Sequence, residues 1–239
     1  MTRRTFACGL AFSALLRAQN RMRARPVAPV EKPAPAGLRK LEARDKRDSL
    51  VYIPEAAAKF AKAPLVLALH GATQGAEQGI ALLRSQADEN GFVLLAPAST
   101  ERTWEIEGDW GEDFDNVDLS LALSFGLRNI DAARIAVAGF SDGASYALAL
   151  GLGNGDLFSA VLGFSAGYLA GVPRVGKPPV FLSAGTEDTI FPIDVCGRAI
   201  AKTLKADGYP VTLREFQGRH TLPPDVAAEA MAWMMKAHS

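Results

Sequence analysis

From residue 48 onward, short apolar runs alternate with longer stretches of helical period. The run Pro64–His70 (PLVLALH) is apolar almost throughout and is followed by Gly71, which is typical of a strand buried on both faces. Ala76–Asn90 repeats its apolar residues at helical spacing and is followed by Gly91, a residue suited to the left-handed end of a helix. Strands that alternate with helices of about 10–15 residues form βαβ units, so the pattern predicts a mostly parallel sheet flanked by helices.

The same alternation continues to the C-terminus. Further strands are predicted at Ser49–Ile53, Phe92–Leu95, Arg134–Ala138, Phe158–Gly163, Val180–Ser183 and Val211–Phe216. Further helices are predicted at Asp115–Ile130, Ala144–Leu152, Ile193–Ala206 and Asp225–Ala237. Open α/β sheets bind their ligands at the carboxyl ends of the strands, so residues that directly follow a strand are the first candidates for a functional site.

The N-terminal region differs from the rest of the chain in charge. The first 50 residues carry 12 Lys and Arg against 4 Asp and Glu, which leaves 14 against 22 in the remaining 189. Within residues 1–20, Arg3 and Arg4 precede the apolar run Ala7–Leu16, which is too short to span a bilayer and predicts an export signal of the twin-arginine kind. We therefore expect an exported protein, periplasmic or secreted, with a cytoplasmic protein that keeps its leader as the alternative.

The segment after this signal is rich in arginine and proline. Such a composition buries little apolar surface, so residues 21–45 are predicted to be a disordered linker before a single folded domain at residues 46–239. The domain is acidic without a basic face, which argues against a nucleic-acid partner, and no segment predicts stable membrane insertion. Cys196 is its single cysteine and is expected to be a buried core residue. The oligomeric state stays open.

A candidate nucleophile lies between a predicted strand and a predicted helix. Gly139-Phe140-Ser141-Asp142-Gly143 matches the pattern Gly-x-Ser-x-Gly, in which a sharp turn lifts the serine above the sheet. The strand Arg134–Ala138 precedes it and the helix Ala144–Leu152 follows it. A serine hydroxyl in this position is a nucleophile when a neighbouring base activates it.

The chain contains a second match to the same pattern, Gly163-Phe164-Ser165-Ala166-Gly167. This match also follows a predicted strand. The residues after it, however, include Gly171, Pro173 and Gly176, which are incompatible with a helix of useful length. Because the pattern requires a strand–turn–helix context, we select Ser141 over Ser165 as the nucleophile.

The base and the acid are expected after the serine in the chain. The order Ser, acid, His is the one that accompanies this strand–turn–helix serine. Of the three histidines, His220 alone follows Ser141 in a loop after the last predicted strand, whereas His70 precedes the serine and His238 is next to the C-terminus. Asp188 follows the strand Val180–Ser183 and is the candidate acid, which would orient the imidazole. Glu187 and Asp194 are the alternatives.

Hydrolysis of an acyl group also requires donors for the negative charge that develops on the carbonyl oxygen. One candidate is the backbone N–H of Asp142, directly after the serine at the start of a helix. The other is an N–H in the loop after His70-Gly71, either that of Ala72 or that of Thr73. A simple strand-ending turn at His70-Gly71 is the structural alternative.

A polar loop at about Ser99–Phe114 bears two tryptophans, Trp104 and Trp110. Residues 103–118 include seven carboxylates, and by position the loop should overhang the site. Trp104 and Trp110 are candidates for an apolar wall that binds substrate. The alternative is a solvated loop that the tryptophans anchor. The carboxylates lack the regular spacing of a calcium loop, so no metal is expected.

Four sequences together carry a resemblance to a known superfamily: LHGATQG near residue 70, NIDAARIAVAGFSDGASYA around Ser141, GTEDTIFP at Asp188 and GRH at His220. They resemble α/β-hydrolases, in particular small bacterial serine esterases of the phospholipase/carboxylesterase and polyhydroxybutyrate-depolymerase-like groups. The resemblance spans about residues 48–237 and implies an α/β-hydrolase fold without a large lid domain, a Ser141–Asp188–His220 triad and no cofactor. It departs from dienelactone-hydrolase-like relatives, which carry cysteine at the nucleophile position.

The activity that the resemblance implies is hydrolysis of a small, accessible carboxylic ester through an acyl-enzyme. A thioesterase or peptidase with the same three residues is one alternative. A catalytically silent binding protein is another, because a fold does not dictate a function.

Overall fold

The computed structural model describes residues 21–26, 30–42, 48–105 and 111–236. Within these residues eight strands form one sheet in the spatial order β1-β2-β4-β3-β5-β6-β7-β8. The strands are β1 (Gly37–Leu41), β2 (Ser49–Ile53), β3 (Ala63–Leu69), β4 (Val93–Ala96), β5 (Ile130–Phe140), β6 (Ala160–Phe164), β7 (Val180–Gly185) and β8 (Val211–Phe216). Strands β3 to β8 are parallel, and β2 is antiparallel to both of its neighbours.

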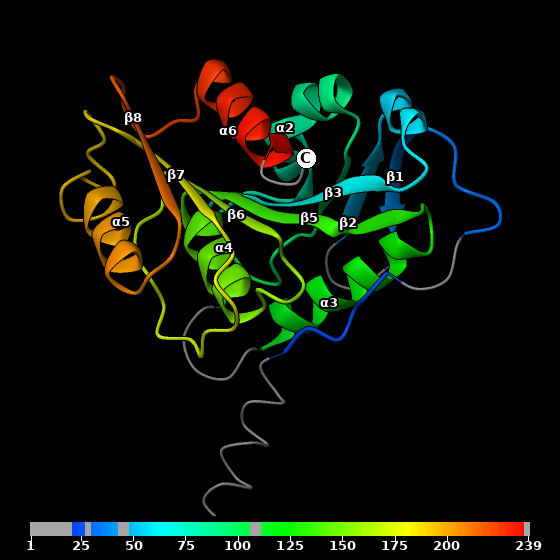
Figure 1. Ribbon diagram of the computed structural model, residues 1–239, viewed down its shortest axis with the longest axis horizontal. Helices are drawn as coiled ribbons and strands as arrows, with labels where there is room; N and C mark the ends of the chain where they lie inside the picture. The colour runs from blue at the N-terminus through cyan, green and yellow to red at the C-terminus, as the bar shows by residue number, and fades with distance from the viewer. Residues whose placement is uncertain (1–20, 27–29, 43–47, 106–110, 237–239) are drawn as a thin grey trace, which may run out of the picture.

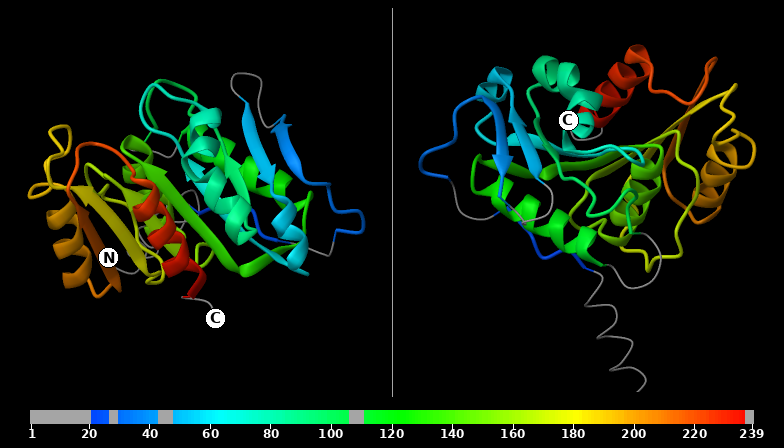
Figure 2. Two further views of the ribbon diagram at one scale, coloured as in Figure 1. Left: turned by 90° about the horizontal axis from the view of Figure 1, so that it is seen from above. Right: turned by 180° about the vertical axis from the view of Figure 1, so that it is seen from behind.

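Helices cover both faces of this sheet (Figure 1). They are α2 (Ala76–Asn90), α3 (Glu112–Phe125), α4 (Asp142–Gly153), α5 (Gly197–Ala206) and α6 (Pro224–Lys236), and a 3₁₀ helix η1 spans Glu55–Lys59. Helices α2 and α6 lie on one face, whereas α3, α4 and α5 lie on the other, as the turned views also show (Figure 2). The predicted helix-flanked, mostly parallel sheet is confirmed, and no separate lid domain interrupts the part of the chain that the structure describes.

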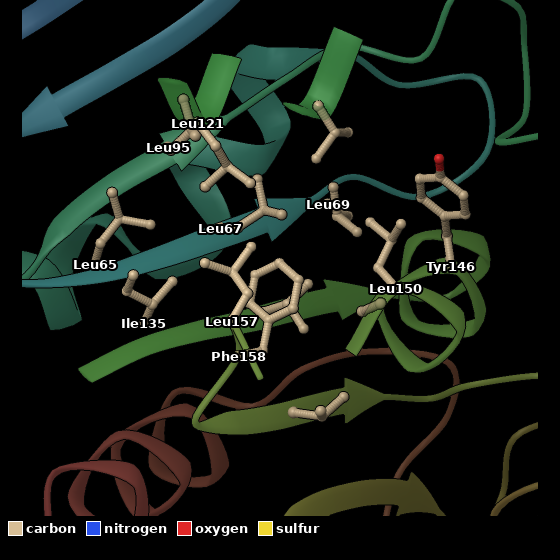
Figure 3. Packing of buried hydrophobic residues seen from close by; sticks show 14 of the residues in the cluster. Leu65, Leu67, Leu69, Leu95, Leu121, Ile135, Tyr146, Leu150, Leu157 and Phe158 are labelled. Carbon is tan, nitrogen blue, oxygen red and sulfur yellow. The ribbon is translucent and has the colours of Figure 1, made fainter. Parts of the chain in front are cut away.

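The alternation of side chains along β3 builds a core on each face. Leu65, Leu67 and Leu69 pack with α3 and α4, and Figure 3 shows them beside Ile135 and Leu150. The intervening residues of β3 belong to the second core, with α2 and α6. A strand that is covered on both faces has no polar side, which explains the continuous apolar run in the sequence. Each of the three leucines is fully buried, which contributes about 1.5–3 kcal/mol per side chain.

Most predicted elements are confirmed to within a few residues, and three boundaries differ. Strand β5 is longer than predicted because Ile130 already pairs with Ala63; an irregularity then shifts the register, so that Leu65 pairs with Ile135. Helix α3 begins and ends earlier than predicted, and Gly111 and Gly126 flank it. Helix α5 begins at Gly197 instead of Ile193, because the preceding residues form turns.

The prediction of a disordered linker at residues 21–45 is wrong for the residues that the structure describes there. Residues 37–41 form the edge strand β1, paired with β2 from Gly37↔Ile53 to Leu41↔Ser49. Just before this strand, the Ala34 N–H donates to the Leu127 carbonyl at 2.8 Å. The folded domain therefore begins well before residue 46.

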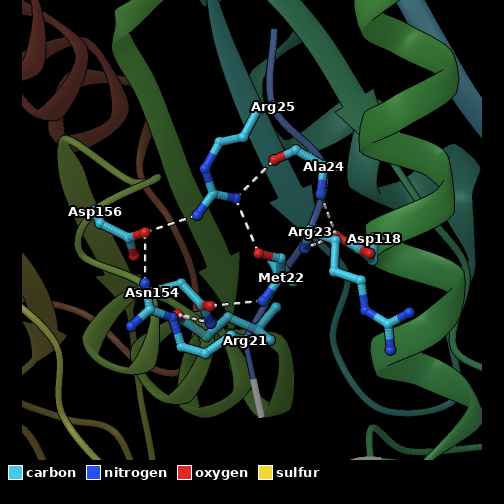
Figure 4. Close-up of polar contacts among 9 residues, drawn as sticks. Arg21, Met22, Arg23, Ala24, Arg25, Asp118, Asn154 and Asp156 are labelled. Atoms are coloured by element: carbon cyan, nitrogen blue, oxygen red, sulfur yellow. Dashed lines mark hydrogen bonds and ion pairs between the residues drawn. The ribbon is translucent and has the colours of Figure 1, made fainter. Parts of the chain in front are cut away.

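Residues 21–26, which we call the N-terminal strap, are also part of the domain (Figure 4). The Met22 N–H donates to Asn154 Oδ1 at 2.8 Å, and the N–H groups of Arg23 and Ala24 donate to Asp118 Oδ1 at 2.8 and 2.9 Å. The Met22 side chain is 2% exposed within the core. Side-chain oxygens of α3 and of the residue after α4 thus satisfy the backbone of the strap, which the composition of the segment did not reveal.

The predicted export signal at residues 1–20 lies outside the described residues and stays a prediction. Among the helices that the structure describes, none combines the length and hydrophobicity needed to cross a bilayer.

Candidate active site

Ser141 lies at the sharp turn between β5 and α4. Its backbone has φ 58° and ψ −120°, in the left-handed region of φ that non-glycine residues rarely adopt. The flanking glycines allow the turn: a Cβ at Gly139 would overlap the Gly143 carbonyl, and a Cβ at Gly143 would overlap the carbonyl oxygens of Leu69 and His70. The strand–turn–helix context predicted for Ser141 is therefore present, with the helix packed directly on the strand ends.

A continuous chain of hydrogen bonds joins the three predicted residues. His220 Nε2 lies 2.8 Å from Ser141 Oγ, and His220 Nδ1 lies 2.7 Å from Asp188 Oδ2. Because Nδ1 faces a carboxylate, we assign its hydrogen to that nitrogen, which leaves Nε2 to accept the hydroxyl proton of Ser141.

The second oxygen of Asp188 is also satisfied. Asp188 Oδ1 accepts the backbone N–H groups of Ile190 and Phe191 at 2.8 and 2.9 Å, and the side chain is 1% exposed. The alternative acids lie elsewhere: Glu187 accepts a hydrogen bond from Gln217, and Asp194 pairs with Arg198. The two N–H donors to Asp188 were not predicted, since only the turn geometry reveals them.

The topology explains why these residues meet. Ser141, Asp188 and His220 follow β5, β7 and β8, which end at the same edge of the sheet. At the end of β7, a Cβ at Gly185 would overlap the carbonyl oxygens of Gly218 and Arg219. A glycine there lets the loop that carries His220 lie against the end of β7, within reach of Asp188.

The loop after β3 lies beside Ser141. A Cβ at Gly71 would be 3.5 Å from the Ser141 Cβ. The Thr73 N–H donates to the Arg102 carbonyl at 2.6 Å. The N–H groups of Ala72 and Asp142, by contrast, have no acceptor within the residues that the structure describes. Of the two predicted loop donors, Ala72 is therefore the one whose amide is available.

The side chains of His70 and Trp104 hydrogen-bond to the backbone at the start of this loop. The His70 ring is 1% exposed; Nε2 accepts the Ser99 N–H at 3.0 Å, which leaves Nδ1 to donate to the Gly71 carbonyl at 2.8 Å. Trp104 Nε1 donates to the His70 carbonyl at 2.8 Å, and the indole packs against the rings of both His70 and Tyr146. These contacts leave Trp104 4% exposed.

The expectation that Trp104 forms a wall for substrate does not fit these contacts, because the residue is 4% exposed and its ring packs against the rings of His70 and Tyr146. The anchoring alternative fits them instead. Trp110 lies outside the described residues, so its predicted role in substrate binding stays a prediction.

Acidic residues of the same region bind backbone amides. Asp142 Oδ2 accepts the Trp104 N–H at 3.0 Å, and both oxygens of the buried Asp113 accept N–H groups, from Thr100 and from Glu105. Burial raises the pKa of the Asp142 carboxyl above its ordinary value, against the lowering effect of the Trp104 hydrogen bond. Within the described residues no group of three His, Cys, Asp or Glu side chains is arranged to hold a metal ion.

Two surface features occur on loops at this edge of the sheet. Beside the loop after β3 lies an open cleft of about 560 Å³, lined mainly by polar residues that include Thr73, Gln74 and Gln78. After β6 and β7, the apolar side chains of Tyr168, Ile190 and Val195 are exposed. Neither feature was predicted, because both depend on which loops the fold brings to this edge.

No family model and no curated protein sequence matches this chain. Solved structures are similar to it. The esterase PE8 matches 77% of this chain and 96% of its own, with a TM-score of 0.64 and 24% identity. An S-formylglutathione hydrolase from Staphylococcus aureus matches 83% and 99%, with a TM-score of 0.66 and 12% identity. A phospholipase/carboxylesterase from Dyadobacter fermentans matches 82% and 99%, with a TM-score of 0.61 and 22% identity. These likenesses show that the chain has the α/β-hydrolase fold.

Proposed function

We propose that this protein is a serine hydrolase that cleaves carboxylic esters through an acyl-enzyme. The observation that carries the proposal is the hydrogen-bond chain from Ser141 Oγ through His220 to the buried Asp188. Structures of similar fold, named as an esterase, a phospholipase/carboxylesterase and an S-formylglutathione hydrolase, support the same class of reaction.

In the first half of the reaction, Ser141 Oγ attacks the ester carbonyl carbon while His220 Nε2 accepts its proton. The carbonyl oxygen takes up negative charge beside the N–H groups of Ala72 and Asp142. Asp188 holds the imidazole in the required tautomer and stabilises its protonated form without accepting the proton itself. The tetrahedral intermediate then collapses, the C–O bond of the ester breaks, and His220 donates the proton to the departing alcohol.

In the second half, water replaces the alcohol. His220 accepts a proton from water, the hydroxide attacks the acyl carbon, and collapse of the second intermediate returns the proton to Ser141 Oγ and releases the carboxylic acid. No cofactor is needed, because each proton and electron pair is accounted for by the ester, water and these residues.

The test is labelling by a fluorophosphonate probe followed by peptide mapping, together with hydrolysis of p-nitrophenyl acetate. We expect one labelled peptide, containing Ser141, and ester turnover that disappears as labelling proceeds. Absence of labelling on folded protein would instead favour a silent binding protein. A panel of matched esters, thioesters and peptides separates the esterase from the thioesterase and the peptidase, which would use the same residues.

A further inference from the structure

The second Gly-x-Ser-x-Gly sequence, Gly163–Gly167, lies directly beside the first. It ends strand β6, which the sheet places between β5 and β7, the strands that precede Ser141 and Asp188. Ser165 has φ 52°, the same unusual backbone region as Ser141. Its side chain is buried, with the residue 2% exposed, so its hydroxyl is directed to the protein interior instead of to a substrate.

Backbone hydrogen bonds connect this second sequence to both neighbouring strand ends. The Ser141 N–H donates to the Phe164 carbonyl at 2.9 Å, and the Ser165 N–H donates to the Ser183 carbonyl at 2.8 Å. A third link reaches helix α4: the Gly167 N–H donates to Ser145 Oγ at 3.1 Å. The nucleophile, its helix and the end of β7 are thus tied to one short segment.

Two further contacts reach the base. Ser165 Oγ lies 3.5 Å from the carbonyl oxygen of Thr221, the residue after His220, and donates to it. At Gly167 the missing side chain makes room for the Phe191 ring, since a Cβ there would lie 2.7 Å from ring carbons. That ring packs edge-on against the His220 imidazole, with centroids 5.4 Å apart, and the Phe191 N–H donates to Asp188 Oδ1 at 2.9 Å.

From these contacts we propose that Gly163–Gly167 is a positioning element of the active site, in which Gly167 and Ser165 are positioning residues for His220. Because Gly167 has no side chain, the Phe191 ring can pack against it. The ring in turn contacts the His220 imidazole and limits its movement between Ser141 and Asp188. Ser165 holds the backbone directly after His220 through its hydrogen bond to the Thr221 carbonyl. The inference rests on the proposed function only for its kinetic readout, because the contacts themselves hold whatever the substrate is.

The test is the variant Gly167→Ala, with Gly171→Ala as its matched control. A Cβ at Gly171 would meet nothing within 4 Å, so this control adds the same methyl group to a nearby open position. With p-nitrophenyl acetate as substrate, we expect Gly167→Ala to lower kcat about tenfold with KM within about twofold, because small displacements of a catalytic group are costly. Gly171→Ala should match the wild type in both constants.

A double variant separates positioning from general damage. In a Phe191→Leu background the ring that the new methyl group would strike is gone, so adding Gly167→Ala should cost less than about twofold in kcat. Equal losses in the two backgrounds, or a loss no larger than that of Gly171→Ala, would overturn the proposal.

A spectroscopic readout keeps the test independent of ester turnover. The Nδ1–H of His220 bonds to a carboxylate at 2.7 Å, which should give a resolved downfield proton resonance. We expect this resonance to shift or broaden in Gly167→Ala, and to change little on adding Gly167→Ala to the Phe191→Leu background. A wild type that shows no esterase activity would remove the proposed function, whereas an unchanged resonance in Gly167→Ala would remove the positioning role.

Discussion

The two Gly-x-Ser-x-Gly sequences of this chain share their backbone turn and differ in their surroundings. Ser141 and Ser165 both follow a parallel strand and both have φ between 50° and 60°. The Ser141 hydroxyl faces His220 Nε2 at 2.8 Å, whereas the Ser165 hydroxyl faces a backbone carbonyl. The five residues therefore encode a turn, and the chemistry of the serine depends on which side chains the fold brings to it.

The segment after each serine accounts for much of the difference. Asp142 begins α4, so its N–H lies at the positive end of a helix, where negative charge is stabilised. After Ser165, residues 166–179 contain no helix. The flanking glycines differ in the same way: Gly139 and Gly143 face backbone atoms, whereas Gly163 and Gly167 face the side chains of Leu182 and Phe191. The first sequence is enclosed by backbone that has little freedom to move, and the second by side chains that can adjust.

The largest expected difference concerns the serines themselves. Ser141→Ala should lower ester turnover by at least about 10³-fold and abolish fluorophosphonate labelling, because no other hydroxyl among the described residues bonds to His220. Ser165→Ala should keep labelling and lower kcat by about two- to threefold, since it removes only the contact with the Thr221 carbonyl. Steady-state kinetics and labelling of both variants make the comparison.

Circular dichroism of both serine variants is the control for folding. Loss of labelling in Ser165→Ala, with labelling retained in Ser141→Ala, would reverse the assignment of the two sequences.

The next largest expected effect is on stability and compares the first glycine of each sequence, Gly139 and Gly163. Gly139→Ala places a methyl group on the Gly143 carbonyl and should cost more than about 3 kcal/mol of unfolding free energy, because backbone at the strand–helix packing must move. Gly163→Ala brings a methyl group 3.0 Å from Leu182 Cδ2, so a small side-chain adjustment should limit the cost to about 1 kcal/mol. Urea denaturation of both variants measures the difference. Similar losses would show that the second turn is as tightly enclosed as the first.

The far end of α4 gives a third, smaller contrast. Asn154, directly after this helix, accepts the Met22 N–H, so the N-terminal strap supports the helix that begins after Ser141. Met22→Ala should lower the unfolding free energy by about 2 kcal/mol through the cavity it leaves, whereas Arg23→Ala changes an exposed side chain and should lower it by less than about 0.5 kcal/mol. Thermal melts of the two variants test this, and equal midpoints would mean that the strap is not part of the folded core.

These contrasts show what the sequence could and could not predict. The proximity of Ser141, Asp188 and His220 could be predicted because each follows a strand, and parallel strands end at one edge of a sheet. The strap was not predicted because its contacts join residues that are far apart in the sequence: Met22 and its acceptor Asn154 are 132 positions apart. The same holds for Trp104, whose hydrogen-bond partner His70 is 34 positions away, and for the packing of the Phe191 ring against Gly167. Local patterns predict turns and strand ends, whereas packing partners far along the chain require the fold.

The smallest expected effect concerns the fourth residue of each Gly-x-Ser-x-Gly sequence. This residue is the charged Asp142 in the first sequence and the uncharged Ala166 in the second. Burial raises the pKa of Asp142 in the folded state, so the folded protein binds this proton more tightly than the unfolded chain. The contribution of Asp142 to stability is therefore greatest in acid and declines as the pH rises through the raised pKa. Asp142→Asn removes that decline while its side-chain oxygen still accepts the Trp104 N–H.

Relative to the wild type, Asp142→Asn should gain less than about 1 kcal/mol of unfolding free energy at pH 7, a small value because the carboxylate is partly exposed. The gain should shrink as the pH falls through the pKa of Asp142, which burial raises, because the wild-type carboxyl then takes up its proton. Urea denaturation at pH 4, 5.5 and 7 measures it. If the variant is instead less stable at pH 7, the attraction of the carboxylate to the N-terminus of α4 outweighs its burial. The charge at this position would then stabilise the first turn in a way that the second turn, with Ala166, cannot reproduce.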